Sequence, residues 1–564
     1  MAQQSPPFTD HKSVCLDTKT NQDVIRLVTE FPSNIWKDSD AFTASNIATR
    51  ILEFDKTYGK KMEELKDELR EMLIAPTNDP TEKVGLINSL CRLGVSYHFV
   101  TEMEEQLTQI FESQPYHSDD NDYDLYTVSL MFRVLRQHGY NMSCCNFDKF
   151  KNSDGKFKEI LTSDAKGMLS LYEAAHLRRH GEDILEEALV FSKAHLKSLA
   201  EKSRLNVAKQ IMEALEMPLH KGMPRLEARK HISFYQVDDS RNHTLLLFAK
   251  LDFNRLQLLH QQELSNLLSW WKILDLPSKL SYIRDRLMET YLSVVMIYFE
   301  PCYSRARLIL CKLTKVITII DDTFDSYGTF EELQLFTHAV QRWDISALDE
   351  LPDYMKIVYG TLLTVFDEIS HDLTEEEISY KLSYIKNAMK EIVTAYFVEA
   401  EWLNQNYVPP FDEYMRNGSI SVGLFLFTAA SFLGMREENA FDWLQTGPKN
   451  LRAAYFIARG RNDLMNHKFD LAKAHGACSV ECYMNEYGLT TKETIEKLNK
   501  MFENAWKDIN EAYIKPTAVS METLLRVVNF GRLAEVSYKD ADGYTNPQYF
   551  KDHICKLFFH QISI

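Results

Sequence analysis

Three carboxylates follow an apolar run near the middle of the chain. The run Val316-Ile317-Thr318-Ile319-Ile320 leads directly into Asp321-Asp322-Thr323-Phe324-Asp325. Residues four apart share one face of a helix, so Asp321 and Asp325 would repel each other unless a cation lay between them. Ligation by oxygen alone suits Mg²⁺. The spacing therefore predicts a magnesium site, and the simpler alternative is an acidic helix end that faces solvent.

A helix stop follows these carboxylates. The next residues are Ser326-Tyr327-Gly328, and glycine commonly ends a helix. The carboxylates would then lie near a helix C-terminus, where the partial negative charge of the helix dipole also favours a cation.

A second set of oxygen-bearing side chains lies about 140 residues further on. Asn462, Asn466 and Asp470 are spaced in steps of four. Each step turns only about 40° around a helix of 3.6 residues per turn, so the three side chains form one stripe. Alone, such a stripe is most simply a polar helix face. Opposite the first motif, it predicts the second half of a metal clamp.

Basic residues accompany both acidic stretches. Arg284 and Arg286 precede the first one, Arg459 precedes the second, and Lys473 follows it. Arginine grips phosphate oxygens with two parallel hydrogen bonds. Together with the carboxylates, these residues predict a site for a magnesium-bound diphosphate.

The rest of the chain predicts helices that would position these residues. Only 19 Gly and 16 Pro occur among 564 residues, and the apolar residues recur at helical spacing. We expect helices over 44–73, 84–109, 126–138, 245–271 and 306–327, and no strands. A polar, turn-rich stretch from Pro218 to His243 predicts the joint between two all-α domains, 1–240 and 241–564.

Charge and cysteine content exclude several classes of protein. The net charge of −17 disfavours binding to nucleic acid or to an anionic membrane surface. The apolar stretch Leu424–Leu433 is too short to span a bilayer, which needs about 20 residues. Nine Cys without a CxxC pair favour reduced thiols, and the N-terminus lacks the pattern of a secretory signal or transit peptide. We expect a cytoplasmic protein.

The sequence resembles the class I terpene synthases of plants, in the branch of angiosperm sesquiterpene synthases. The resemblance covers nearly the whole chain. Besides the DDxxD stretch, the matching motifs are Arg284-Asp285-Arg286, Leu171-Tyr172-Glu173-Ala174, Gly181-Glu182-Asp183-Ile184-Leu185, and Ala534-Glu535-Val536 through Asp542-Gly543-Tyr544-Thr545.

This resemblance implies a catalytic C-terminal α-bundle and a non-catalytic, α-barrel-like N-terminal domain. It implies three Mg²⁺ ions, or Mn²⁺ in their place, a prenyl diphosphate substrate, and a monomer. The implied metal ligands are Asp321, Asp322, Asp325, Asn462, Asn466 and Asp470. The implied substrate-binding residues are Arg284, Asp321, Asp325, Arg459, Asn462 and Lys473. The implied catalytic residues are Asp321, Arg284, Arg286, Tyr538, Asp542 and Tyr544.

Several positions depart from the family pattern. Asn466 stands where Ser or Thr is usual, Asp470 where Glu is usual, and Lys473 where Arg is common. Ser293 replaces an aromatic residue that lines the pocket in many relatives. Near the N-terminus, only Arg26 and Trp36 remain of a motif linked to capping of the active site.

The implied activity is that of a carbon–oxygen lyase acting on a phosphate. Farnesyl diphosphate would ionise, and the resulting C15 carbocation would cyclise or rearrange in an apolar pocket before quenching. Gly423, inside an apolar helix, is consistent with a kink in a helix that lines this pocket. Two alternatives remain at this point: a chain-elongating prenyltransferase, and a helical relative with little or no activity.

Overall fold

The computed structural model describes Arg26 and residues 31–37, 44–77, 79–113, 123–374, 378–433, 435, 439–470 and 478–564. Within these ranges the regular structure is entirely helical, apart from one isolated bridge between Lys151 and Phe157. The predicted all-α fold is therefore confirmed. No helix in these ranges is both long and apolar enough to cross a membrane.

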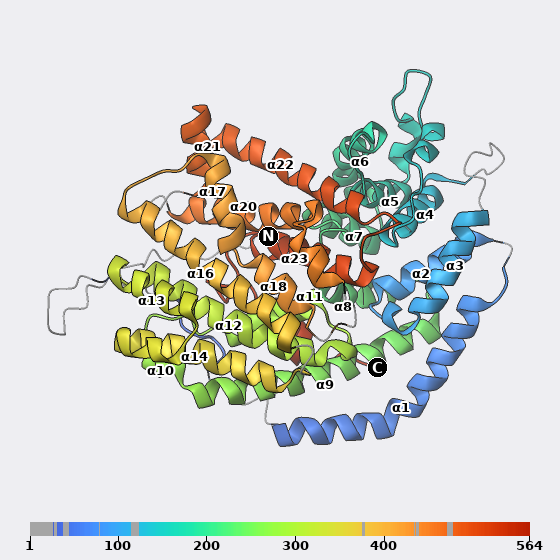
Figure 1. The fold of residues 1–564 in the computed structure, drawn as a ribbon. Coiled ribbons are helices and arrows are strands. Elements are labelled where there is room, and N and C mark those ends of the chain that lie inside the picture. Colours follow the sequence, from blue (N-terminus) through green and yellow to red (C-terminus); the bar gives the residue numbers. More distant parts are fainter. Residues whose placement is uncertain are drawn as a thin grey trace, which may run out of the picture.

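The N-terminal helices gather on one side of the molecule (Figure 1). They are α1 (Ala44–Ile74), α2 (Pro80–Arg92), α3 (Val100–Ser113), α4 (Leu125–Gln137), α5 (Ala165–Ala175), α6 (Asp183–Lys202), α7 (Leu205–Glu216) and α8 (Pro224–Tyr235). Helix α1 runs beside α9 of the second domain, and α4, α5, α6 and α7 pack in sequence order.

One prediction in this part of the chain needs correction. The single helix expected over 84–109 is broken into α2 and α3, because Gly94 adopts φ +75° and a Cβ there would lie 2.8 Å from Ala228 Cβ. The polar stretch from Pro218 to His243, which was predicted to join the two domains, is partly helical. It contains α8, which begins at Pro224, where the missing N–H costs nothing in the first turn of a helix.

The C-terminal helices form the larger bundle (Figure 1). They are α9 (His243–Leu274), α10 (Leu276–Lys279), α11 (Leu287–Ile297), α12 (Ser304–Ser326), α13 (Phe330–Arg342), α14 (Asp353–His371), α16 (Ser383–Asn404), α17 (Phe411–Ser421), α18 (Leu424–Ser431), α19 (Ala440–Gln445), α20 (Lys449–Asp470), α21 (Ser479–Tyr487), α22 (Thr491–Ala512), α23 (Met521–Ser537) and α24 (Lys551–Ile554). Helix α12 packs against α11, α14, α16 and α18, and α20 packs against α17, α21, α22 and α23.

Polar contacts join the two halves, and others hold the C-terminal tail in place. The Glu503 carboxylate accepts hydrogen bonds from Lys221 Nζ at 2.6 Å and from Arg178 Nη2 at 2.8 Å. The C-terminal tail lies against α9, where Asn254 and Ile562 exchange two hydrogen bonds of 2.8 and 2.9 Å. The eight described cysteines are free thiols, as predicted, and Cys15 lies outside the described residues.

Candidate active site

Helix α12 presents the first acidic motif in its last two turns. Val316, Ile317, Ile319 and Ile320 are buried, so this part of the helix packs firmly into the core. The helix ends at Ser326, and the Gly328 N–H donates a 2.8 Å hydrogen bond to the Thr323 carbonyl. The carboxylates therefore lie at a helix C-terminus, as the sequence predicts.

The three carboxylates of this motif have different surroundings. Asp322 is 1% exposed, and its two oxygens accept hydrogen bonds from the Arg284 backbone N–H at 2.7 Å and from Arg284 Nε at 2.6 Å. Asp321 is partly exposed and Asp325 is exposed. Asp321 and Asp325 are thus accessible, whereas Asp322 holds Arg284 in place.

The accessible carboxylates repel one another. The pKa of Asp325 lies well above its usual value because the surrounding protein restricts its hydration and because Asp321 and Glu399 add negative charge. A divalent cation among these oxygens would relieve the repulsion. The donor set therefore fits a hard, oxygen-liganded ion such as Mg²⁺.

Glu399 on α16 was not predicted from the sequence. Its Oε1 accepts a 2.6 Å hydrogen bond from Ser421 Oγ and lies 3.9 Å from Arg459 Nη1. Burial raises its pKa, and the charges of Arg459, Asp463 and Asp321 act on it as well. Glu399 thus lies between the first motif and the helix that carries the second. The only sequence signal for it is an acid inside an otherwise apolar helical stretch, Ala395–Ala400.

Helix α20 carries the predicted polar stripe. Asn466 Nδ2 donates a 3.3 Å hydrogen bond to Asn462 Oδ1, so these two amides lie on one face. The Tyr538 hydroxyl, on the turn after α23, faces Asn462. Asp470 is the last residue of α20, but the structure does not describe its side chain. Lys473 is not among the residues that the structure describes.

Arg459, on α20, is held by contacts with α17 and with its own helix. Its Nε donates to the Tyr414 hydroxyl at 2.9 Å and lies 3.0 Å from Asp463 Oδ1. Gly418 leaves room for this arginine, because a Cβ there would lie 3.1 Å from Arg459 Cγ. The guanidinium is therefore fixed next to Glu399.

Arg284 lies beside the first motif. Its Nη2 donates to Asp321 Oδ2 at 2.6 Å and its Nη1 to Thr545 Oγ1 at 3.2 Å. The guanidinium also lies near the rings of Phe31 and Tyr544, 5.2 and 5.3 Å from their centroids. Arg284 thereby joins the acidic motif to a C-terminal loop.

Arg286 is turned away from the acidic motif. It is 1% exposed, and its donors reach backbone carbonyls: Tyr544 from Nε at 3.1 Å, Asp285 from Nη1 at 3.1 Å, and Thr545 from Nη2 at 3.2 Å. Its Nη2 also donates to the Pro32 carbonyl. In this structure Arg286 therefore fastens two loops, and four of its five N–H groups are already engaged with backbone carbonyls.

The C-terminal loop that contacts both arginines is shaped by Asp542. Its Oδ1 accepts hydrogen bonds from the Tyr544 N–H at 2.9 Å and the Thr545 N–H at 3.1 Å. The Tyr544 hydroxyl lies 3.5 Å from Lys315 Nζ. Tyr538, Asp542 and Tyr544 are thus brought to the first motif from the far end of the chain.

An N-terminal segment also reaches this region. Arg26 forms a two-armed ion pair with Glu332 on α13, with both N···O distances at 2.7 Å. Trp36 Nε1 donates to Glu289 Oε1 at 2.8 Å, and Asn34 Nδ2 donates to Asp285 Oδ2 at 2.8 Å. The two residues that survive from the N-terminal motif therefore both contact the C-terminal domain.

The predicted helix break is present. Helix α17 ends at Ser421 and α18 begins at Leu424, with Gly423 at φ +76° between them. Ser293, which replaces an aromatic residue, donates a 3.0 Å hydrogen bond to the Glu289 carbonyl in its own helix.

Family models match most of the chain. Residues 35–215 match the terpene synthase N-terminal domain, and residues 272–508 match the metal-binding domain of the terpene synthase family. The chain is 46% identical to a valerianol synthase of Camellia hiemalis, over 95% of this chain and 97% of that protein. It is 48% identical to probable terpene synthase 6 of Ricinus communis, over 96% of this chain and 100% of that protein. It is also 46% identical to the chloroplastic casbene synthase of Ricinus communis, over 99% of this chain and 92% of that protein.

Solved structures agree with these matches. Isoprene synthase from grey poplar, in complex with three Mg²⁺ ions and dimethylallyl-S-thiolodiphosphate, superposes with a TM-score of 0.83 at 31% identity, over 90% of this chain and 98% of that one. Limonene synthase with 2-fluorolinalyl diphosphate gives a TM-score of 0.87 at 28% identity, over 95% of this chain and 99% of that one. The two-domain helical fold and the metal-binding domain are thus those of plant terpene synthases. The chain belongs to the terpene synthase family and is an enzyme of that class, a carbon–oxygen lyase.

Proposed function

We propose that this enzyme is a sesquiterpene synthase that ionises farnesyl diphosphate, releases diphosphate, and converts the C15 carbocation into a cyclised or rearranged terpene. The observation that carries the proposal is the arrangement around Glu399. The charge of Glu399 acts on Asp325 of α12, and Glu399 lies 3.9 Å from Arg459 of α20, the helix that carries the polar stripe. Such a site offers oxygen ligands for cations next to arginines that can meet an anion.

The metal ligands proposed are Asp321 and Asp325 from α12 and Asn462, Asn466 and Asp470 from α20, with Glu399 as an additional acidic neighbour. Three Mg²⁺ ions, or Mn²⁺ in their place, are proposed, and the poplar isoprene synthase complex supports this number. When bound, the divalent ions supply positive charge that stabilises the diphosphate as it leaves.

The chain's own residues divide the remaining work. Arg284, Arg459 and Lys473 would neutralise the diphosphate, and Arg284 would exchange Asp321 for a phosphate oxygen. Asp322 and Arg286 act as positioning residues. Asp322 is buried and holds Arg284, and Arg286 is buried and holds loop carbonyls such as that of Tyr544. Asp542 and Tyr544 would hold the C-terminal loop against the substrate.

An apolar, aromatic surface suits the carbocation. Tyr396 of α16 packs 5.7 Å from Phe324, beside the acidic motif, and α18 is composed almost wholly of apolar residues. Aromatic faces attract positive charge, and exclusion of water prevents early quenching to an alcohol. Tyr538 would add a further ring near Asn462.

The choice of a C15 substrate rests on the expected cytoplasmic location. The relatives' names give different products, valerianol, casbene, isoprene and limonene, and one of these relatives is named as chloroplastic. A cytoplasmic location, a domain division at 240/241 and a monomeric state form part of this proposal.

Incubation of the purified enzyme with Mg²⁺ and geranyl, farnesyl or geranylgeranyl diphosphate tests the proposal, with products identified by gas chromatography–mass spectrometry. We expect C15 products from farnesyl diphosphate and none from Asp321→Ala. Products of C10 or C20 alone would contradict the proposed chain length. A longer diphosphate after addition of isopentenyl diphosphate would support a prenyltransferase, and no product from any substrate would support an inactive relative.

A further inference from the structure

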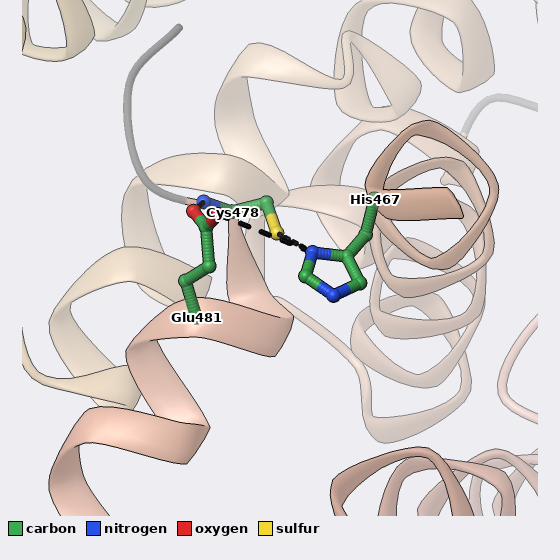
Figure 2. A group of neighbouring side chains, drawn as sticks. All are labelled: His467, Cys478 and Glu481. Carbon is green, nitrogen blue, oxygen red and sulfur yellow. Dashed lines mark hydrogen bonds and ion pairs between the residues drawn. The ribbon is translucent and has the colours of Figure 1, made fainter. Parts of the chain in front are cut away.

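A histidine, a cysteine and a glutamate meet where α20 ends and α21 begins (Figure 2). His467 comes from the last turn of α20, and Cys478 and Glu481 come from the start of α21. The Cys478 Sγ lies 3.8 Å from His467 Nδ1, and Glu481 Oε1 lies 4.0 Å from the same nitrogen. One donor atom from each residue lies within 4.8 Å of the others.

These separations are close to those of a tetrahedral zinc site. Bonds of about 2.0–2.1 Å to nitrogen, 2.3 Å to sulfur and 2.0–2.2 Å to oxygen place neighbouring donors roughly 3.3–3.7 Å apart. The two distances from His467 Nδ1 exceed this range by a few tenths of an ångström, and all three donor atoms lie within 4.8 Å of one another. A modest approach of the three side chains would therefore bring nitrogen, sulfur and oxygen onto one ion.

The cluster has no cation of its own among the residues that the structure describes. Glu481 has only His467 within ion-pair distance there, and its Oε2 accepts a 3.0 Å hydrogen bond from the Cys478 N–H. A comparable group of His180, Asp508 and Glu511 differs in this respect, because Lys449 Nζ lies 2.8 Å from Asp508 Oδ1 and 3.5 Å from Glu511 Oε2. A lysine thus already supplies the positive charge in that group.

Burial and chemistry distinguish the cluster from the acidic motifs. His467 is 8% exposed, and its Nε2 has no partner within the described part of the chain. Imidazole and thiolate are soft ligands that select zinc or cobalt over magnesium, which prefers oxygen. The cluster would therefore not compete with the α12 carboxylates for the same ion.

We propose that His467, Cys478 and Glu481 form a binding site for one thiophilic divalent cation, Zn²⁺, separate from the magnesium site. On binding, a bond forms between Zn²⁺ and the Cys478 sulfur, and the thiol proton leaves to solvent. Water completes the coordination. The ion ties the end of α20, one residue after Asn466, to the first turn of α21. This inference rests on the geometry of the described residues and does not depend on the proposed substrate.

Cobalt titration of the chelator-treated, full-length enzyme tests the site. A bond from Co²⁺ to a thiolate gives a charge-transfer absorption band in the near ultraviolet, which oxygen-only sites do not give. We expect the band to saturate at one ion per chain, to disappear in Cys478→Ser, and to require at least tenfold more Co²⁺ in His467→Gln and in Glu481→Gln. Zn²⁺ should displace the Co²⁺ and raise the melting temperature of the wild type but not that of Cys478→Ser.

Cys91→Ser is the matched control. Its sulfur lies 3.9 Å from His138 Nε2 but belongs to no three-donor cluster within the described residues, so the band should persist in this variant. Serine is a favoured helix N-cap, so Cys478→Ser should keep the start of α21 folded, and circular dichroism checks this. A thiolate band that survives Cys478→Ser, or no band with the wild type, would overturn the proposal. If Cys478→Ser does not fold, unchanged binding in both His467→Gln and Glu481→Gln would do the same.

Discussion

Asp321, Asp322 and Asp325 carry the same chemical group, and the helix on which they lie gives each a different environment. Four-residue spacing points Asp321 and Asp325 in one direction, whereas Asp322 is turned into the protein and meets Arg284. A single substitution at each position should therefore have different consequences for activity and for stability.

Replacement of Asp325 and Asp322 by asparagine separates these two roles. Asp325→Asn should keep the melting temperature and lower kcat by at least tenfold, because an accessible ligand is weakened. Asp322→Asn should destabilise the fold by about 1–3 kcal/mol, because it removes the charge of a buried carboxylate that accepts two hydrogen bonds from Arg284 and leaves this arginine with its contact to Asp321. Thermal unfolding and steady-state kinetics measure both effects, and equal melting temperatures for the two variants would contradict this division.

Glu399 provides a prediction about metal affinity. In Glu399→Gln the Oε1 atom can still accept from Ser421 Oγ, but the negative charge that acts on Asp325 is lost. We expect the Mg²⁺ concentration for half-maximal rate to rise several-fold with an unchanged melting temperature. Glu401→Gln, two residues along α16, is the control and should behave like the wild type.

The residues of the site differ in how well they could be predicted. Asp321, Asp325, Asn462 and Asn466 follow from helical spacing alone, because their partners lie one turn away. Glu399 could not be predicted, because its importance depends on α16 packing between α12 and α17, a long-range contact that leaves no local pattern.

At the scale of elements, the break between α17 and α18 depends on one glycine. Gly423→Ala forces alanine into a left-handed conformation and places a Cβ 3.0 Å from both Ile392 and Phe427. The free energy of unfolding should fall by about 1–3 kcal/mol. Product distribution should change as well, because the start of α18 would shift.

Gly360→Ala, in the interior of α14, is the matched control. A Cβ there would have nothing within 4 Å, and alanine favours a helix over glycine by about 1 kcal/mol. This variant should be as stable as the wild type or more so, as measured by denaturant unfolding. Equal effects of the two substitutions would show that the break does not depend on the backbone of Gly423.

Helices were easier to predict than their ends. The periodicity of apolar residues predicted α1, α4, α9 and α12 to within a few residues, because each has a continuous buried face. The division between α2 and α3 was missed, because it requires Gly94 to approach Ala228 of α8, more than 130 positions away in sequence. Such a tertiary contact can override a local helical pattern.

At the scale of the whole molecule, a partly buried acid, Glu173, links the N-terminal domain to the joint. The Leu219 N–H donates a 2.8 Å hydrogen bond to Glu173 Oε2, and burial raises the pKa of Glu173 to about 7. An unfolded glutamate has a pKa of about 4.3. Because the folded pKa is the higher one, the contribution of Glu173 to stability is fully present below about pH 4.3 and is lost as the pH rises through about 7.

Glu173→Gln removes this dependence and keeps an acceptor for Leu219. The variant should melt at a higher temperature than the wild type at pH 8, and the difference should shrink toward pH 5. Scanning calorimetry at both values measures it. Glu187→Gln, at a half-exposed position on α6 with no such burial, is the control. A constant difference between variant and wild type at all pH values would contradict the assignment to Glu173.

The contacts of Arg26, Asn34 and Trp36 have a practical consequence for protein engineering. These residues lie near the start of the sequence, yet they are fastened to Glu332, Asp285 and Glu289 of the C-terminal domain. A chimera that exchanges catalytic domains between relatives at a single crossover near residue 240 would separate this segment from the surface it fits. Two crossovers, which carry residues 26–37 together with the catalytic domain, would transfer Arg26, Asn34 and Trp36 together with the residues that they contact.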